Sequence, residues 1–138
     1  MNLWRMPAEG GTEEQVTQHG GMYPVESFDG QYIYFSKSGT DATIWRVPSA
    51  GGEEEQVLGV PVPADNSHWA LTRDGIYIVN QNGDLLFYAF ANQRTVRIEH
   101  HAGFLTNWSM TLSPDGRELV WAQVDSRNED LLMVDNFE

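Results

Sequence analysis

The chain has 138 residues, a mass of 15.6 kDa and no cysteine, which excludes a disulfide framework and a thiolate metal site. Eight Lys and Arg residues against twenty Asp and Glu residues give a formal net charge of −12, and such a surface repels nucleic-acid phosphates. No apolar run approaches the roughly twenty residues that a membrane-spanning helix needs.

The chain begins with a short apolar segment that runs into a glycine-rich turn, Leu3 to Gly11, and this segment recurs 41 residues later as Ile44 to Gly52. Extended to Gln18 and Gly59, the comparison covers sixteen aligned positions with nine identities. Both copies read as a strand, a turn and a second short strand at a sheet edge. The glutamates of these edge segments, at 13–14 and 53–55, are expected to discourage sheet-to-sheet aggregation.

A second repeated element is a tight turn followed by an alternating strand. It reads Ser113-Pro114-Asp115-Gly116-Arg117-Glu118-Leu119-Val120-Trp121, with weaker copies over 27–35 and 72–79. The Asp of each copy is expected to cap the turn and the Gly to take a positive φ. The turn glycines Gly30, Gly75 and Gly116 lie 45 and 41 residues apart, in the range of four-stranded propeller blades.

The strands that follow these turns are apolar on both faces, as Tyr32 and Tyr34 alternate with Ile33 and Phe35. Such a pattern favours inner strands of stacked sheets over half-exposed ones. Sustained helical periodicity is lacking, so we predict an all-β fold made of about three four-stranded antiparallel β-propeller blades.

Lettering each blade A to D from the axis to the rim gives thirteen predicted strands. They are A at 22–27, 68–72 and 108–113; B at 31–37, 75–80 and 118–124; C at 3–6, 43–47, 85–90 and 130–135; D at 13–17, 54–58 and 95–99. The whole chain, 1–138, is then a partial propeller: 1–18 supplies strands C and D of a split blade, 19–59 and 60–100 are blades, and 101–138 is a last blade without its outer strand.

About three blades cannot close a ring, because propellers typically have four to eight. Either the chain is the C-terminal portion of a larger protein, or identical copies assemble. Two copies supply twenty-six strands against the twenty-four of a six-bladed ring, which leaves one surplus C strand per chain. The expected partner is therefore a second copy, in a homodimer that makes each chain half of a six-bladed propeller.

The Ser-Pro-Asp-Gly-Arg-x-Leu-x-Trp turn and strand, together with the Leu/Ile-Trp-Arg-Met/Val-Pro-x-x-Gly-Gly segment, resembles the WD40-like repeats of TolB-type propellers, also called PD40 repeats. More narrowly, the chain is similar to the C-terminal part of bacterial regulators in which a winged-helix domain precedes such a propeller. The resemblance implies the fold and leaves the function open, because these propellers serve as partner platforms, peptidase gating domains and sugar-binding enzymes. In the middle copy Thr72-Arg73 stands in place of Ser-Pro, and Phe87 in place of Trp45.

Five residues in or beside loops rich in His and Asn form the candidate ligand-binding site, at a mouth of the expected channel: His68, Trp69, His101, Asn107 and Trp108. An aromatic ring beside a polar loop can stack on a ligand, although core packing is the favoured interpretation of the two tryptophans. The other three tryptophans, Trp4, Trp45 and Trp121, occupy repeat positions and are predicted to fill the space between blades.

Catalytic and metal-binding patterns are weak. His68, His100 and His101 with Asp65 and Glu99 are the best set, but adjacent residues on a strand point to opposite faces, so surface histidines are favoured over a metal site. The aspartates of the repeated turns suit turn capping better than calcium binding. No nucleophile elbow or phosphate-binding loop is found, and we predict neither a catalytic residue nor a cofactor.

The sequence thus predicts a non-catalytic scaffold that displays loops to another protein, a peptide or a small ligand, without nucleic-acid or membrane partners. Two enzyme-related alternatives stay open: the propeller part of a serine peptidase whose catalytic part is absent, and a sugar-active hydrolase. The second requires paired carboxylates in the channel, of which only Glu26 is suitably placed. The chain shows no signal peptide, and the lack of cysteine fits cytoplasm and periplasm equally, so the compartment is not assigned.

Overall fold

The structure is a computed structural model that describes residues 1–37, 43–58, 68–100, 110–113 and 115–121. All regular structure among these residues is β-strand, which confirms the all-β prediction. The described residues include no helix long and apolar enough to cross a membrane.

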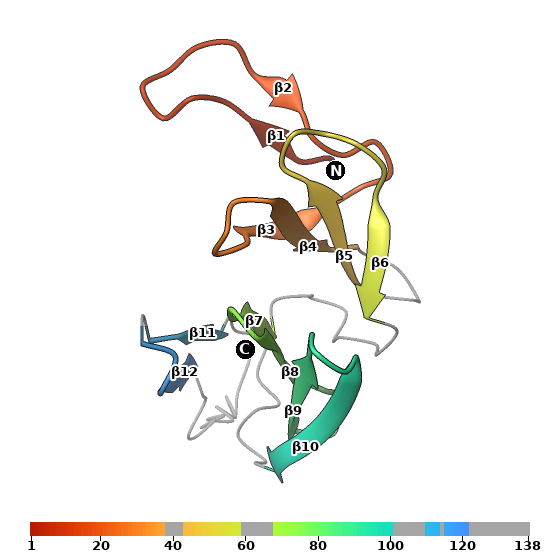
Figure 1. The fold of residues 1–138 in the computed structure, drawn as a ribbon, viewed down its shortest axis with the longest axis vertical. Helices are drawn as coiled ribbons and strands as arrows, with labels where there is room; N and C mark the ends of the chain where they lie inside the picture. Colours follow the sequence, from red (N-terminus) through yellow and green to blue (C-terminus); the bar gives the residue numbers. More distant parts are fainter. Residues whose placement is uncertain (38–42, 59–67, 101–109, 114, 122–138) are drawn as a thin grey trace, which may run out of the picture.

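The strands form four antiparallel sheets in chain order (Figure 1). The first sheet pairs β1 (Trp4–Arg5) with β2 (Glu14–Gln15), and the second has the order β3 (Met22–Glu26), β4 (Tyr32–Ser36), β5 (Ile44–Pro48) and β6 (Glu55–Leu58). The third has the order β7 (Trp69–Leu71), β8 (Gly75–Val79), β9 (Asp84–Ala89) and β10 (Arg94–His100), and the fourth pairs β11 (Met110–Leu112) with β12 (Leu119–Trp121).

Twelve of the thirteen predicted strands are therefore present, eleven of them within two residues of their predicted bounds; the twelfth, predicted at 118–124, is β12 at Leu119–Trp121, and 122–124 lie outside the described residues. The two complete sheets run A, B, C, D as predicted, because hairpins join neighbouring strands. The predicted strand 130–135 lies outside the described residues.

The central strands of each complete sheet are covered on both faces, whereas β3 and β10 at the sheet edges are largely exposed, and β4 shows how the sequence achieves this coverage. Phe35, with no exposed surface, packs with Leu3 and Val47 toward the β1–β2 sheet. The next residue back, Tyr34, joins Ile44 and Trp69 in a core shared with the β7–β10 sheet. Because successive strand residues point to opposite faces, the apolar alternation of one strand supplies two cores.

Strand β8 repeats this arrangement one sheet further along the chain. Ile76 and Ile78 have no exposed surface and belong to the core shared with β4 and β5. Val79 packs with Met110 of β11 in a third core, between the β7–β10 and β11–β12 sheets. The sheets are thus stacked face to face in chain order. The prediction of inner strands buried on both faces is confirmed for β4 and β8, whereas Val120 and Trp121 of β12 are exposed.

The repeated turn is built as predicted in its first and last copies. Asp29 Oδ1 accepts hydrogen bonds from Ser27 Oγ at 2.6 Å and from the Gln31 N–H at 3.0 Å, and Asp115 makes the equivalent bond to Ser113 Oγ at 2.6 Å. Gly30 and Gly116 have φ of 69° and 70°. The hydrogen bond from the serine hydroxyl makes the largest contribution to lowering the pKa of each aspartate. Both aspartates therefore stay ionised into the acid range.

The middle copy is a different turn, and two predictions about it are wrong. The Thr72 hydroxyl, rather than the Asp74 carboxylate, accepts the N–H groups of Asp74 and Gly75. Gly75 is the first residue of β8 and has no positive φ. The reason is that this turn is shorter: the Thr72 N–H bonds the Gly75 carbonyl, three residues on, whereas in the other two copies the serine N–H bonds a carbonyl five residues on. A glycine is needed here because the backbone of β9 lies close to Gly75: an added Cβ would lie 2.1 Å from the carbonyl oxygen of Tyr88.

The prediction that the repeat tryptophans fill the space between blades is wrong for two of them. Trp4 is 55% exposed and Trp121 is also exposed, whereas Trp45 is half-buried against the core with Phe35 and Val47. Trp4 and Trp121 belong to the two end sheets, each of which has a described neighbour on one face only. This position accounts for the exposure of Trp4, which points away from the side on which its neighbour Leu3 packs, but not for that of Trp121, which shares a face of β12 with the packed Leu119.

Glu54 also departs from its predicted role as an exposed edge charge, because its side chain is only 7% exposed. Its Oε1 accepts the backbone N–H of Gln18 at 2.8 Å and that of His19 at 3.2 Å, and its Oε2 contacts Lys37 Nζ at 2.5 Å. The carboxylate therefore connects the segment after β2 to the next sheet. Burial raises the pKa of Glu54, but the bonds from Lys37, Gln18 and His19 together outweigh burial and hold the pKa below its ordinary value of 4.5.

We expect Glu54→Gln to lower the free energy of unfolding by about 1.5–3 kcal/mol at neutral pH, because hydrogen bonds to a charged group are lost or weakened. Since the pKa is lower in the folded state, the ionised Glu54 stabilises the fold above pH 4.5, its ordinary value, and this contribution is lost as the pH falls through the folded pKa. Urea unfolding of both proteins across this range should give stabilities that converge in acid.

The control is Glu55→Gln, which removes an exposed ion pair with Arg46. Its cost should stay below about 1 kcal/mol. A Glu54→Gln cost that does not change with pH would contradict the assigned role of the carboxylate.

Candidate functional site

The predicted channel-mouth group is only partly within the described residues, since His101, Asn107 and Trp108 lie outside them. The two described members are buried. Trp69 is 5% exposed and packs in the core between the second and third sheets, which agrees with core packing as the favoured interpretation. His68 precedes it, and its carbonyl accepts the Val79 N–H at 2.9 Å. These two residues present no open surface to a ligand.

His100 and its carboxylate neighbours lie at the end of β10. His100 Nδ1 is 3.0 Å from Asp84 Oδ1, and Arg97 and Asn80 also contact the Asp84 carboxylate. The hydrogen bond from Asn80, followed by that from His100, holds the pKa of Asp84 below its usual range. His100 itself is exposed, so this is a hydrogen-bonded surface contact at a hairpin; within the described ranges no cluster of three His, Cys, Asp or Glu residues is arranged to hold a metal ion.

The described surface is hollowed where the A–B turns meet the neighbouring sheet. The larger groove, of about 510 Å³, lies between the second and third sheets. It is lined by the turn residues Phe28 and Asp29, by Thr72 and Arg73 of the next turn, and by side chains of the facing strands, among them Tyr32, Tyr34, Arg46, Glu55, Tyr88 and Phe90.

Aromatic rings form much of the wall of this groove. Tyr34 stacks on Phe90 with ring centroids 5.7 Å apart, and Tyr32 meets Tyr34 edge to face at 6.5 Å. The Arg46 guanidinium lies 4.5 Å from the Tyr32 ring centre and donates to Glu55 Oε2 at 2.8 and 2.9 Å. The groove thus already holds a cation on an aromatic face beside a carboxylate.

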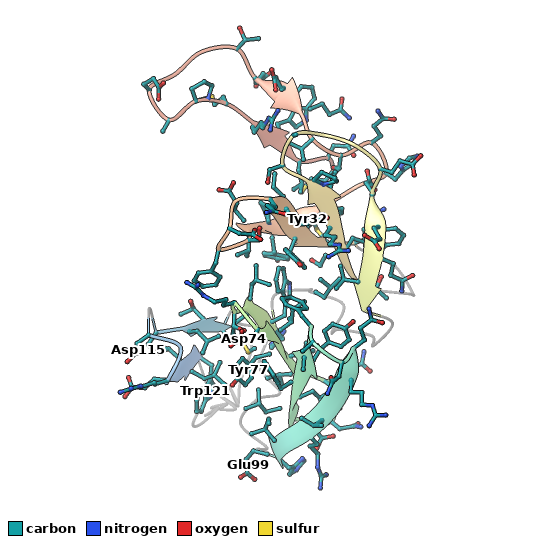
Figure 2. The ribbon with its side chains drawn as sticks, viewed as in Figure 1. Tyr32, Asp74, Tyr77, Glu99, Asp115 and Trp121 are labelled. Carbon is teal, nitrogen blue, oxygen red and sulfur yellow. The ribbon has the colours of Figure 1, made fainter. Side chains whose placement is uncertain are left out.

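A second groove, of about 400 Å³, lies between the third sheet and the β11–β12 sheet. Asp74, Asp115, Tyr77 and Phe87 contribute to its lining; Figure 2 labels the first three of these. Tyr77 and Phe87 form a tilted pair with centroids 4.7 Å apart. The two grooves share Phe28, Leu71, Thr72 and Arg73, so they are neighbours on the face of the molecule that carries the A–B turns.

Sequence reasoning missed both grooves, although one signal was present. The repeat places Arg5 and Glu14 at the positions of Arg46 and Glu55, and both pairs are ion pairs across a C–D hairpin, each with a 2.8 Å contact. The same spacing of opposite charges occurs in both copies of the repeat, and in the second copy it forms one side of the groove. The aromatic wall was not foreseen, because it combines strands from two sheets.

The fold and the site together define an all-β protein of stacked antiparallel sheets with grooves between the turns of neighbouring sheets. No protein-family model matches the chain, and no curated protein matches it.

Proposed function

We propose that this protein is a non-catalytic β-propeller scaffold that displays its turn face to a binding partner, with a ring completed by a second copy of the chain. The observation that carries the proposal is that each of the two end sheets has two described strands, and that one repeats the outer half and the other the inner half of a complete four-stranded sheet. The likeness of the repeated turn to PD40 repeats supports it from the sequence side.

The β1–β2 sheet matches the outer half of a complete sheet. Arg5 of β1 pairs with Glu14 of β2, just as Arg46 of β5 pairs with Glu55 of β6. The β11–β12 sheet matches the inner half, because the Ser113 N–H bonds the Glu118 carbonyl as the Ser27 N–H bonds that of Tyr32.

Among the described strands, β12 pairs only with β11, and β1 only with β2. If β12 of one copy pairs with β1 of a second copy, the four strands make one blade in the order A, B, C, D. Each copy then has two complete blades of its own and half of each of two shared ones, which gives six in all.

Exposed apolar side chains on the end sheets support this closure. Trp4 and Met6 are 55% and 60% exposed, while their repeat equivalents Trp45 and Val47 pack in a core with the preceding sheet. Val120, on the opposite end sheet, is 56% exposed. Burying such residues is the main driving force for association, at about 25 cal/mol per Å² of apolar area.

Each contact therefore joins two unlike surfaces: the β1–β2 end of one copy meets the β11–β12 end of the other, and two such contacts, related by a two-fold axis, close the ring. Trp4→Glu and Val120→Glu should each abolish the dimer, because each places a charge in one of the two different surfaces. Light scattering of the separate variants should give the monomer mass of 15.6 kDa.

Mixing the two variants provides the sharper test. In a 1:1 mixture the intact β11–β12 end of Trp4→Glu meets the intact β1–β2 end of Val120→Glu, so a dimer of twice 15.6 kDa should reappear at high concentration. Phe28→Glu, which charges an exposed aromatic position on the turn face, is the control and should remain dimeric. A dimer that survives both single substitutions would contradict the proposed closure.

A further inference from the structure

We propose that the two grooves form one furrow that binds an extended, arginine-containing basic peptide segment. The inference rests on the proposed function as a binding platform and names the class of partner that the turn face takes.

The shape of the furrow favours an extended ligand. The two grooves, of about 510 and 400 Å³, share Phe28 and Arg73 and cross the turns of the second, third and fourth sheets in succession. A compact small molecule would fill one groove, whereas an extended chain can occupy both and present a side chain to each.

The aromatic lining favours a planar cation. Phe28 is 63% exposed, although it lies beside the charged Arg73, whose guanidinium is 5.9 Å from its ring centre. Arg46 on Tyr32 shows the same kind of contact from within the chain. Guanidinium groups stack on aromatic faces and bond carboxylates with the same plane, which an ammonium group does less well.

The negative charge of the furrow favours a positively charged ligand. Arg46 is matched by Glu55 at 2.8 Å, and Arg117 Nε lies 4.0 Å from Asp115 Oδ2, which leaves Arg73 against the carboxylates of Asp29 and Asp74. The hydrogen bonds that Asp29 and Asp115 accept from Ser27 and Ser113 favour their ionised forms. The chain as a whole has a formal net charge of −12. A basic peptide is attracted by this field, and an acidic one is repelled.

The test uses fluorescein-labelled peptides of alternating sequence, (Arg-Gly)₆, (Lys-Gly)₆ and (Glu-Gly)₆, titrated with the full chain and followed by fluorescence anisotropy at physiological salt. The arginine peptide should bind, the lysine peptide should bind more weakly and the acidic peptide should not bind. Phe28→Ala and Asp74→Asn should each weaken binding of the arginine peptide about five- to tenfold.

The matched controls are Tyr23→Ala, an exposed aromatic outside the furrow, and Glu53→Gln, an exposed carboxylate outside it. Both should bind as the unmodified chain does. Absence of binding by (Arg-Gly)₆ would overturn the inference. Equal weakening by the control substitutions would also overturn it, because binding would then not depend on the furrow. Because neither Phe28 nor Asp74 belongs to an end sheet, the mass of each variant reports separately on the proposed ring.

Discussion

Phe35→Ala is expected to lower the free energy of unfolding by about 3–5 kcal/mol, which is the usual cost of removing a fully buried phenylalanine ring. Phe35 has no exposed surface and packs with Leu3 and Val47 between the first two sheets. The loss is a large part of the stability of a small domain, so urea unfolding should show a midpoint shifted strongly to lower concentration.

Phe28→Ala is the matched control, since it removes the same ring from an exposed position. Its cost should lie within about 0.5 kcal/mol. Equal effects of the two substitutions would contradict the stacking of the β1–β2 sheet on its neighbour, because only Phe35 lies in that core.

Gly75→Ala is expected to cost about 3 kcal/mol or more, by forcing apart two paired strands. The added Cβ would meet the Tyr88 carbonyl oxygen at 2.1 Å and the Phe87 ring at 2.7 Å. Gly75 pairs with Ala89 in the ladder between β8 and β9, so relief requires movement of backbone rather than of a flexible side chain.

Gly116→Ala is the control, because it produces backbone strain without a steric clash. Gly116 has a φ of 70° and open space around its Cα, so its substitution carries only the cost of a left-handed conformation, about 1–2 kcal/mol. Thermal and urea unfolding of both variants should rank Gly75→Ala as clearly the worse. The reverse order would mean that the third sheet does not have the described register.

Strand positions could be predicted from the sequence because their signals are local. The Asn82-Gly83 pair, for example, predicts a hairpin, and the structure places Gly83 at φ 79° between β8 and β9. The Ser and Asp of the first and last turns likewise bond within six residues of chain.

The features that were missed depend on contacts distant in the sequence. Glu54 resembles its acidic neighbours in the sequence. What sets it apart is that its buried carboxylate accepts hydrogen bonds from the backbone of Gln18 and His19, 36 and 35 residues away, and from Lys37. Gly75 matches the turn motif in spelling, yet its role is set by Tyr88 on the next strand. The furrow likewise combines turns and strands of three sheets, so no single repeat reveals it.

The central claim is that the β1–β2 and β11–β12 half-sheets of two copies complete each other. Light scattering of the unmodified chain over a range of concentrations tests it most directly. The proposal predicts a stable mass of twice 15.6 kDa that does not grow further, because a closed ring has no free ends. A well-folded monomer of 15.6 kDa at every concentration would contradict it.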